Sequence, residues 1–70
     1  MTTGIEVTIN GQLETLDDNV TAEGLVHSMS LRRQRIAIEI NGEIVPRSTF
    51  AERRIAPGDR IEIVRAVGGG

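Results

Sequence analysis

Hydrophobic and polar residues alternate along several stretches of this chain, and a two-residue period predicts β-strands with one buried face. The alternation is clearest over residues 5–9, 36–40 and 60–67. Isoleucine and valine dominate the apolar positions, and both favour strands because their Cβ is branched. The residues predicted to face the core are Ile5, Val7, Ile9, Ile36, Ile38, Ile40, Ile61 and Ile63.

The pair Asn10-Gly11 predicts a hairpin, because both residues tolerate a positive φ, and the chain returns as a second strand. A two-residue turn would pair Ile9 with Gln12 and leave Leu13 on the outer face. A three-residue turn with a bulge would pair Ile9 with Leu13 and bury the leucine. We predict the bulged turn, because burying leucine is more favourable than burying glutamine.

A second Asn-Gly pair, Asn41-Gly42, predicts another hairpin, whose return strand over residues 43–45 is short. Pro46 ends this strand because proline has no N–H to donate to a sheet. Phe50 is the sole aromatic residue and is predicted to fill the core. Residues 56–59, Ala-Pro-Gly-Asp, predict a turn that leads into the last strand.

A helix is predicted over residues 22–29, with Thr21 as its N-cap. Gly24 is unexpected there, because glycine costs about 1 kcal/mol relative to alanine inside a helix. It is either an exposed weakness or a site where another backbone passes close by. His27 lies outside the apolar stripe and is predicted at the surface. The stripe predicted to be buried comprises Ala22, Leu25, Val26 and Met29.

The predicted order of elements is two strands, a helix, two strands, a short helical turn and a last strand. This order indicates an α+β fold of the β-grasp type: a mixed sheet of four to five strands with one main helix packed on one face. The last strand is expected in the middle of the sheet, parallel to the first. Residues 1–67 are expected to form a single domain, and residues 68–70 a flexible glycine tail.

Composition excludes several classes of function. The chain has 70 residues, a net charge of −2, one histidine and no cysteine. We therefore expect no metal site, no intrinsic catalytic residues and no bound cofactor. The acidic balance and the single aromatic argue against a nucleic-acid partner, although residues 32–35 include three arginines of unassigned role. No apolar run is long enough to span a membrane, and no signal peptide is evident, so we expect a cytoplasmic protein.

The chain ends in three glycines, Gly68, Gly69 and Gly70, directly after the predicted last strand. Three extended residues reach at most about 10 Å, so the tail would be a thin thread that ends in a carboxylate. A partner enzyme with ATP can convert a carboxylate into an acyl-adenylate. Attack by sulfur then leaves a thiocarboxylate, whereas attack by lysine gives an isopeptide. The chain has no lysine, so it cannot form lysine-linked chains on itself.

Five segments of the chain together carry a resemblance to a known family: Asn10-Gly11, Val20–Glu23, Asn41–Ser48, Asp59–Val64 and Ala66–Gly70. On these segments the sequence resembles the ThiS family of sulfur carrier proteins, which serve thiazole formation in thiamine biosynthesis. The resemblance covers nearly the whole length, and its most specific part is the block Asn41–Arg47 together with the terminal glycines.

The resemblance implies that a ThiF-like enzyme uses ATP to adenylate Gly70, and that sulfur from a cysteine desulfurase system converts it into a thiocarboxylate. The carrier would then deliver sulfur to the thiazole synthase ThiG. Gly68 and Gly69 would thread the partner active sites. Strand parity and the resemblance together make Val64, Ala66 and Val67 the expected docking residues.

Two alternatives remain open at this point. A MoaD-like carrier for molybdopterin synthesis would share the fold and the tail chemistry and serve another acceptor. A ubiquitin-like modifier or a plain β-grasp binding module would belong to a different functional class. The MoaD-like carrier predicts a different acceptor enzyme, and the ubiquitin-like modifier predicts isopeptide conjugates. The plain binding module predicts that deletion of Gly69 and Gly70 leaves the function intact.

Overall fold

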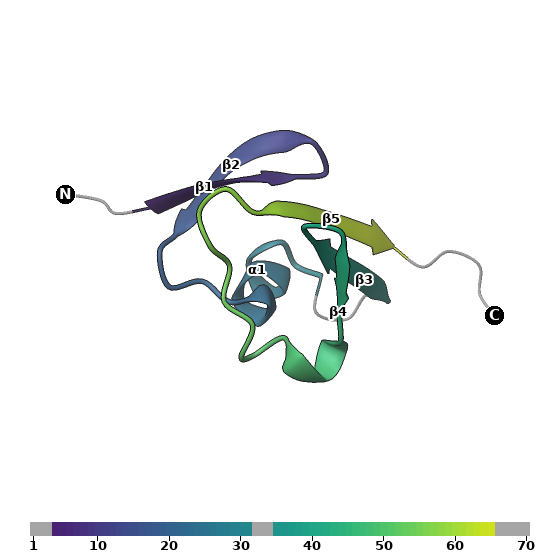
Figure 1. Ribbon diagram of the computed structural model, residues 1–70. Coiled ribbons are helices and arrows are strands. Elements are labelled where there is room, and N and C mark those ends of the chain that lie inside the picture. The colour runs from purple at the N-terminus through teal and green to yellow at the C-terminus, as the bar shows by residue number, and fades with distance from the viewer. Residues whose placement is uncertain (1–3, 32–34, 66–70) are drawn as a thin grey trace.

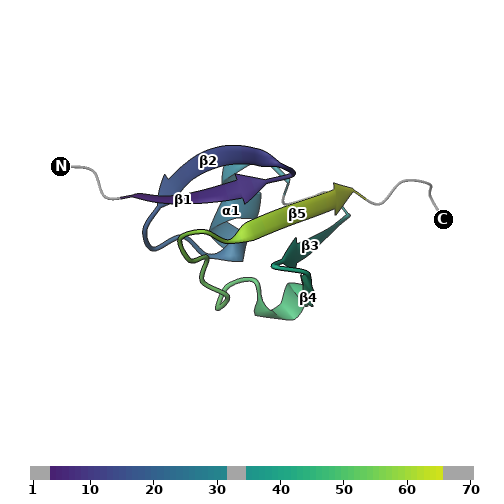
Figure 2. The same cartoon turned by 45° about the horizontal axis from the view of Figure 1, so that its top comes forward.

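The sheet of this protein contains five strands, and a computed structural model describes residues 4–31 and 35–65. The strands lie in the order β2-β1-β5-β3-β4, and α1 lies on one face of the sheet, behind β1 and β5 in Figure 2. Figure 1 labels the strands and α1. The elements are β1 (Gly4–Ile9), β2 (Gln12–Asp17), α1 (Ala22–Ser28), β3 (Ile36–Ile40), β4 (Glu43–Val45), the 3-10 helix η1 (Arg47–Thr49) and β5 (Arg60–Arg65).

The last strand occupies the centre of the sheet, as the sequence predicts. β5 runs parallel to β1, with Ile9 opposite Ile61, and antiparallel to β3, with Ile38 opposite Ile63. Both hairpins are antiparallel. This arrangement confirms the predicted β-grasp fold. It also places the chain's last described residue, Arg65, at the end of a strand that has neighbours on both sides.

The core lies between the sheet and α1, and alternate residues of β1, β3 and β5 supply its sheet side. Phe50 is buried after η1, as predicted from its being the sole aromatic residue. Ile36 and Ile63 lie on the same face but are only partly buried. The buried apolar residues are Ile5, Val7, Ile9, Ala22, Leu25, Val26, Leu31, Ile38, Ile40, Val45, Phe50, Ile55 and Ile61.

The first hairpin differs from the prediction. Ile9 pairs with Gln12 across a two-residue turn, and Leu13 is 66% exposed on the outer face. Asn10 and Gly11 both have positive φ, 52° and 84°, as a tight type I′ turn requires. The bulged turn was predicted to bury Leu13, but β2 is an edge strand and its residues near the turn are exposed on both faces. A shift in register would therefore have gained little burial.

The end of the helix also differs from the prediction. Met29, expected in the buried stripe, is 41% exposed, whereas Leu31 is buried. Ser30 adopts a left-handed φ of 60° and reverses the chain. The N–H groups of Leu31 and Ser30 then bond to the carbonyls of Val26 and His27, which is the Schellman pattern. In the sequence, the helical spacing of apolar residues extends to Met29, although the helix ends at Ser28. The spacing therefore wrongly places Met29 in the core instead of Leu31.

The start of the helix agrees with the prediction. The side chain of Thr21 accepts a hydrogen bond of 3.1 Å from the N–H of Gly24. The N–H of Ala22 donates to the carbonyl of Arg53, and the N–H of Glu23 donates to that of Phe50. The segment between β4 and β5 therefore satisfies the first turn of α1 and fixes it to the rest of the domain.

Candidate functional site

The candidate site is the end of β5 and the residues that follow it. The expected modification site Gly70, the threading residues Gly68 and Gly69, and the docking residues Ala66 and Val67 all lie outside the described residues. The structure does describe the strand from which they continue. Its contacts fix Arg65, the last described residue before the tail, and the expected chemistry of the tail stays a prediction.

Both Asn-Gly turns hold β5 with their asparagine side chains. Asn10 Oδ1 accepts a hydrogen bond of 2.8 Å from the N–H of Ile63, and Asn41 Oδ1 accepts one of 2.9 Å from the N–H of Arg60. The backbone N–H groups of the same asparagines donate to the carbonyls of Ile61 and Arg60. In the sequence, the two asparagines predict turns only. Their spacing from β5 gives no signal of this second role.

A buried carboxylate holds the start of β5. Asp59 is 7% exposed, and its two carboxylate oxygens accept hydrogen bonds from Asn41 Nδ2 at 2.9 Å and from the N–H of Ala56 at 2.8 Å. Gly58, with φ of 83°, completes the predicted turn, and its N–H donates to the carbonyl of Glu6. The strand that leads to the tail is thus fixed at its start and along its length.

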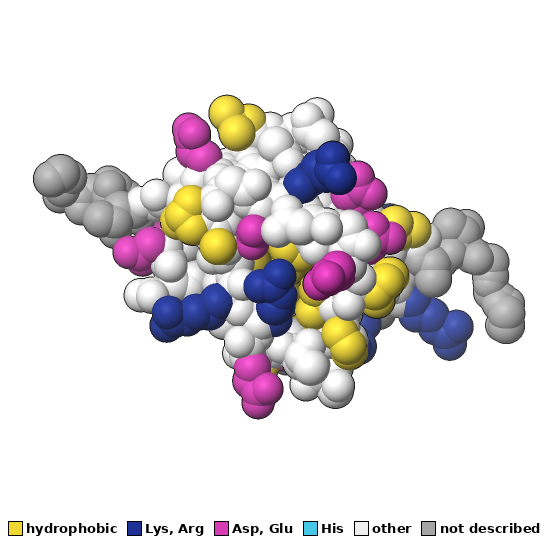
Figure 3. All heavy atoms as spheres, in the orientation of Figure 1, with side chains coloured by type: hydrophobic (Ala, Val, Ile, Leu, Met, Phe, Trp, Pro, Cys, Tyr) yellow, Lys and Arg dark blue, Asp and Glu magenta, His cyan; other side chains and the backbone are white. Residues whose placement is uncertain are grey.

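The outer face of the sheet, opposite α1, carries exposed apolar residues beside the end of β5. Val64 is 57% exposed and pairs with Ala37 of β3. Ile44 of β4 is 63% exposed and lies opposite Glu39, two residues along β3 from Ala37. We call Val64, Ala37 and Ile44 the outer patch. In Figure 3, hydrophobic side chains gather on the side of the molecule that carries β3, β4 and the end of β5.

The structure therefore confirms the prediction that Val64 points outward and is exposed. Its role in docking is not tested by the geometry. Large apolar side chains that stay in water at an ordered strand are typical of surfaces that meet a partner. The outward position of Ile44 was not predicted, because the alternation of a three-residue strand is a weak signal.

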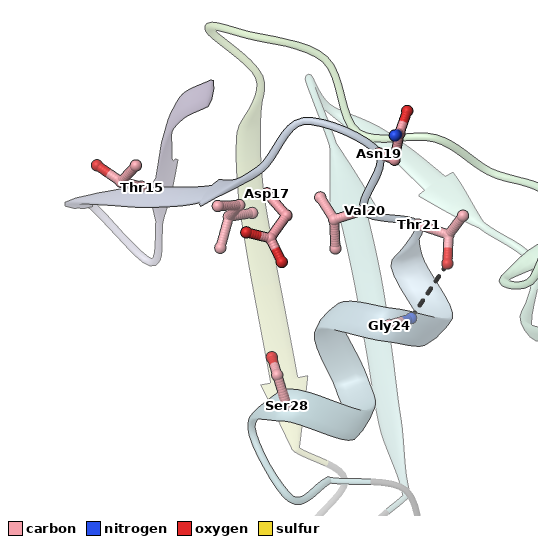
Figure 4. A pocket seen from close by; sticks show the side chains of 8 residues that line it. Thr15, Asp17, Asn19, Val20, Thr21, Gly24 and Ser28 are labelled. Atoms are coloured by element: carbon pink, nitrogen blue, oxygen red, sulfur yellow. Dashed lines mark hydrogen bonds between the residues drawn. The ribbon is translucent and has the colours of Figure 1, made fainter. Parts of the chain in front are cut away.

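A hollow of about 540 Å³ lies along the Gly24 side of α1, between the helix and the end of β2 (Figure 4). Hydroxyl groups of Thr15, Thr21 and Ser28 line it, with Asp17 as its only carboxylate. This set has no nucleophile with an adjacent base. A Cβ on Gly24 would lie 3.5 Å from Val20 Cγ2 and 3.6 Å from Thr21 Oγ1, which are ordinary contacts. Among residues 4–31 and 35–65, no backbone atom therefore requires glycine at this position.

Within residues 4–31 and 35–65, no three histidine, cysteine, aspartate or glutamate side chains come close enough to hold a metal ion. His27 is exposed, as the sequence predicts. Of the described part of the chain, no helix is long and apolar enough to cross a membrane. Arg32 and Arg33 lie outside the described residues, and Arg35 is exposed just before β3.

Residues 7–70 match the model of the ThiS family, so the match includes the terminal glycines. The crystal structure of the thiamine biosynthesis protein ThiS from Geobacter metallireducens is similar in fold, with a TM-score of 0.81 and 26% sequence identity. The similarity covers 94% of this chain and all of that chain.

Two curated relatives differ greatly in length. A thiazole synthase of Paramagnetospirillum magneticum is 35% identical over 66 residues, which are 94% of this chain but 20% of the relative. The protein ycf40 of Porphyra purpurea is 33% identical over 66 residues and is covered over 93% of its length. The chain therefore spans about a fifth of the thiazole synthase and nearly all of the second relative.

Proposed function

This chain belongs to the ThiS family, and from that premise we propose that it is a sulfur carrier of thiamine biosynthesis, acting as a protein substrate of partner enzymes and not as an enzyme itself. The observation that carries the proposal is the family match over residues 7–70, which includes both the β-grasp body and the terminal glycines. The proposal requires that the mature chain end in the Gly70 carboxylate.

The chemistry proposed for the tail has three steps. A ThiF-like enzyme joins a Gly70 carboxylate oxygen to the α-phosphorus of ATP, and pyrophosphate leaves. Persulfide sulfur that originates from cysteine, through a desulfurase system, then attacks the acyl carbon: a C–S bond forms, the C–O bond breaks, AMP leaves, and an acyl disulfide results. A thiol then reduces the S–S bond and is itself oxidised to a disulfide, which leaves a thiocarboxylate on Gly70. The chain's own part is to present Gly68, Gly69 and Gly70 on a strand fixed by Asn10 and Asn41.

Thiazole synthase is the acceptor that we propose for this sulfur. Support comes from the relative of Paramagnetospirillum magneticum, a thiazole synthase of which one fifth resembles 94% of this chain. In that relative, the region that resembles this chain and the rest of the synthase belong to one polypeptide, whereas separate chains would need a docking surface. We assign the outer patch to that docking, together with Ala66 and Val67, which lie outside the described residues.

The test uses the full chain, a purified ThiF-like enzyme, ATP and a cysteine desulfurase with cysteine. The intact mass of the starting protein first establishes that Gly70 is the C-terminal residue. After reaction, a thiol-alkylating reagent is added and the adduct is located by mass spectrometry. Alkylation is needed because oxidation of Met1 or Met29 adds nearly the same mass as exchange of oxygen for sulfur.

We expect an ATP-dependent adduct on Gly70, because the chain has no cysteine that could react instead. Omission of ATP and deletion of Gly69 and Gly70 are the matched controls, and both should abolish the adduct. An unmodified Gly70 in the presence of an enzyme and donor that modify another carrier would contradict the proposal. Sulfur transfer to a molybdopterin precursor, with none to thiazole synthase, would favour the MoaD-like alternative.

A further inference from the structure

A second surface lies beside the end of β5, on the face opposite the outer patch. It is a groove of about 320 Å³ past the end of α1, and we call it the tail-side groove. Its lining residues are Asn10, Met29, Leu31, Ile36, Ile63 and Arg65.

The floor of the groove is apolar because α1 is too short to cover it. The helix has seven residues and ends at Ser28. Ile36 and Ile63 lie on the helix-covered face of the sheet but remain only partly buried. Met29 stands at the rim, 41% exposed, because the reversal at Ser30 sends Leu31 and not Met29 into the core. An exposed methionine adapts readily to the shape of a partner.

One wall of the groove is the short end of β5 that lies beyond its pairing with β1. Pairing between β1 and β5 ends at Ile9 and Ile61, where β1 turns into its hairpin. Asn10 Oδ1 occupies the next N–H, that of Ile63. Backbone N–H groups of alternate residues point to the same side of a strand, so the N–H of Arg65 points the same way. Beyond Asn10, no described strand lies beside β5 on this side, and such an edge can pair with an extended segment.

The charge of the groove is positive. Arg65 is one of its six lining residues, and none of the six is acidic. Ile36 pairs with Arg65, and the exposed Arg35 immediately precedes Ile36, so two arginines stand at this corner of the molecule. The whole chain carries a net charge of −2, so this corner has the opposite sign to the protein as a whole. A carboxylate is the group that complements it.

We propose that the tail-side groove binds an extended segment of the activating enzyme that carries an apolar side chain next to a carboxylate. The apolar side chain contacts Met29, Ile36 and Ile63, the carboxylate pairs with Arg65, and the backbone pairs with the open edge of β5. This inference rests on the proposed function. It adds a second contact, on the helix side, that holds β5 while the tail enters the active site.

The test measures two quantities with the full chain and its purified ThiF-like enzyme: the dissociation constant by isothermal titration calorimetry, and the rate of ATP–pyrophosphate exchange. The groove variants are Met29→Glu and Arg65→Glu. Matched controls are Leu13→Glu, an exposed apolar residue on β2, and Arg54→Glu, an exposed arginine beside Thr21 at the other end of α1. Thermal unfolding of each variant establishes that it folds.

We expect each groove variant to raise the dissociation constant at least tenfold, and each control to change it less than twofold. The defect of Arg65→Glu should shrink in high salt, whereas that of Met29→Glu includes lost apolar contact and should persist. Met29 is not part of the tail, so a defect shared by both variants identifies the groove and not tail threading. If Met29→Glu does not fold, Met29→Ala takes its place, with a smaller rise expected.

Failure of the groove proposal and failure of the proposed function would give different results. If the wild-type chain binds the enzyme and supports exchange, and both groove variants behave like the controls, the groove proposal is wrong and the carrier function stands. If the wild-type chain itself neither binds nor supports exchange with an enzyme that activates another carrier, the proposed function is wrong, and the groove proposal is overturned with it.

Discussion

Asn10 and Ile63 are joined by a hydrogen bond of 2.8 Å that spans 53 positions of the sequence. It links the turn of the first hairpin to the last strand, at the point where β1 no longer accompanies β5. Without it, the N–H of Ile63 would have no strand partner on that side. Asn10 thus has two roles: it adopts the positive φ of the turn, and its side chain holds β5, the strand that precedes the tail.

Replacing Asn10 by glycine should therefore destabilise the protein by about 1 kcal/mol, the usual net value of one hydrogen bond. Glycine keeps the positive φ of the turn at no steric cost, so the loss reports the bond to Ile63 and not the turn. Urea unfolding measures the change. Hydrogen exchange at the amide of Ile63 should accelerate, and this readout is specific to the lost bond.

The matched control for this change is Asn10→Asp, which keeps an acceptor oxygen and also tolerates a left-handed φ. Its stability should lie within about 0.5 kcal/mol of wild type. Equal stability of the glycine and wild-type proteins, with unchanged exchange at Ile63, would contradict the role assigned to the side chain.

The register of the first hairpin gives a second prediction. Leu13 is 66% exposed, so Leu13→Ala should change the unfolding free energy by no more than about 0.5 kcal/mol. Leu25 of α1 is 1% exposed, and Leu25→Ala should cost about 2–5 kcal/mol. Urea unfolding of both variants compares them directly. A cost for Leu13→Ala as large as that for Leu25→Ala would instead support the bulged turn.

The sequence was sufficient to predict the fold because its strong signals agree with one another. Alternation fixes the inward faces of β1, β3 and β5, the Asn-Gly pairs fix both hairpins, and Thr21 fixes the start of α1. The two errors, at Leu13 and Met29, have a common cause. Periodicity shows which residues share a face but not how far the opposite element extends to cover that face.

The candidate site was predictable only in part, for a similar reason. The outward position of Val64 follows from strand parity, and the structure confirms it. The hydrogen bonds from β5 to Asn10 and Asn41, and the tail-side groove, depend on segments far apart in sequence. No local pattern carries that information. The chemistry of Gly70 was inferred from residue type and family resemblance, and it stays a prediction.

The buried carboxylate of Asp59 gives a third prediction. Asp59→Ala would leave Asn41 Nδ2 and the N–H of Ala56 without their acceptors. The bonds are partly buried and have a charged acceptor, but both donors belong to exposed residues that water can reach, so we expect a loss of about 1–3 kcal/mol. Urea unfolding at neutral pH tests this. The control is Glu62→Ala, which removes an exposed carboxylate from β5, the strand that follows Asp59. It should leave the unfolding free energy nearly unchanged.

Gly24 gives a fourth prediction, in the stabilising direction. A Cβ there meets only ordinary contacts at 3.5 and 3.6 Å, so Gly24→Ala should stabilise the protein by about 1 kcal/mol. Thermal unfolding should show a higher midpoint, by several degrees for a domain of this size. A lower midpoint would show that the helix cannot accept the methyl group beside Val20 and Thr21.

The outer patch gives the last prediction, which separates docking from folding. Val64→Asp places a charge on a side chain that is 57% exposed and opposite Ala37, so the unfolding free energy should change by less than about 1 kcal/mol. Binding to thiazole synthase should weaken at least tenfold, because a carboxylate buried in an apolar contact loses its hydration. Calorimetric titration measures binding, and Leu13→Asp, on the same outer face but at the edge strand β2, is the control. Unchanged affinity of Val64→Asp would exclude the outer patch from this contact and leave the end of the chain to supply it alone.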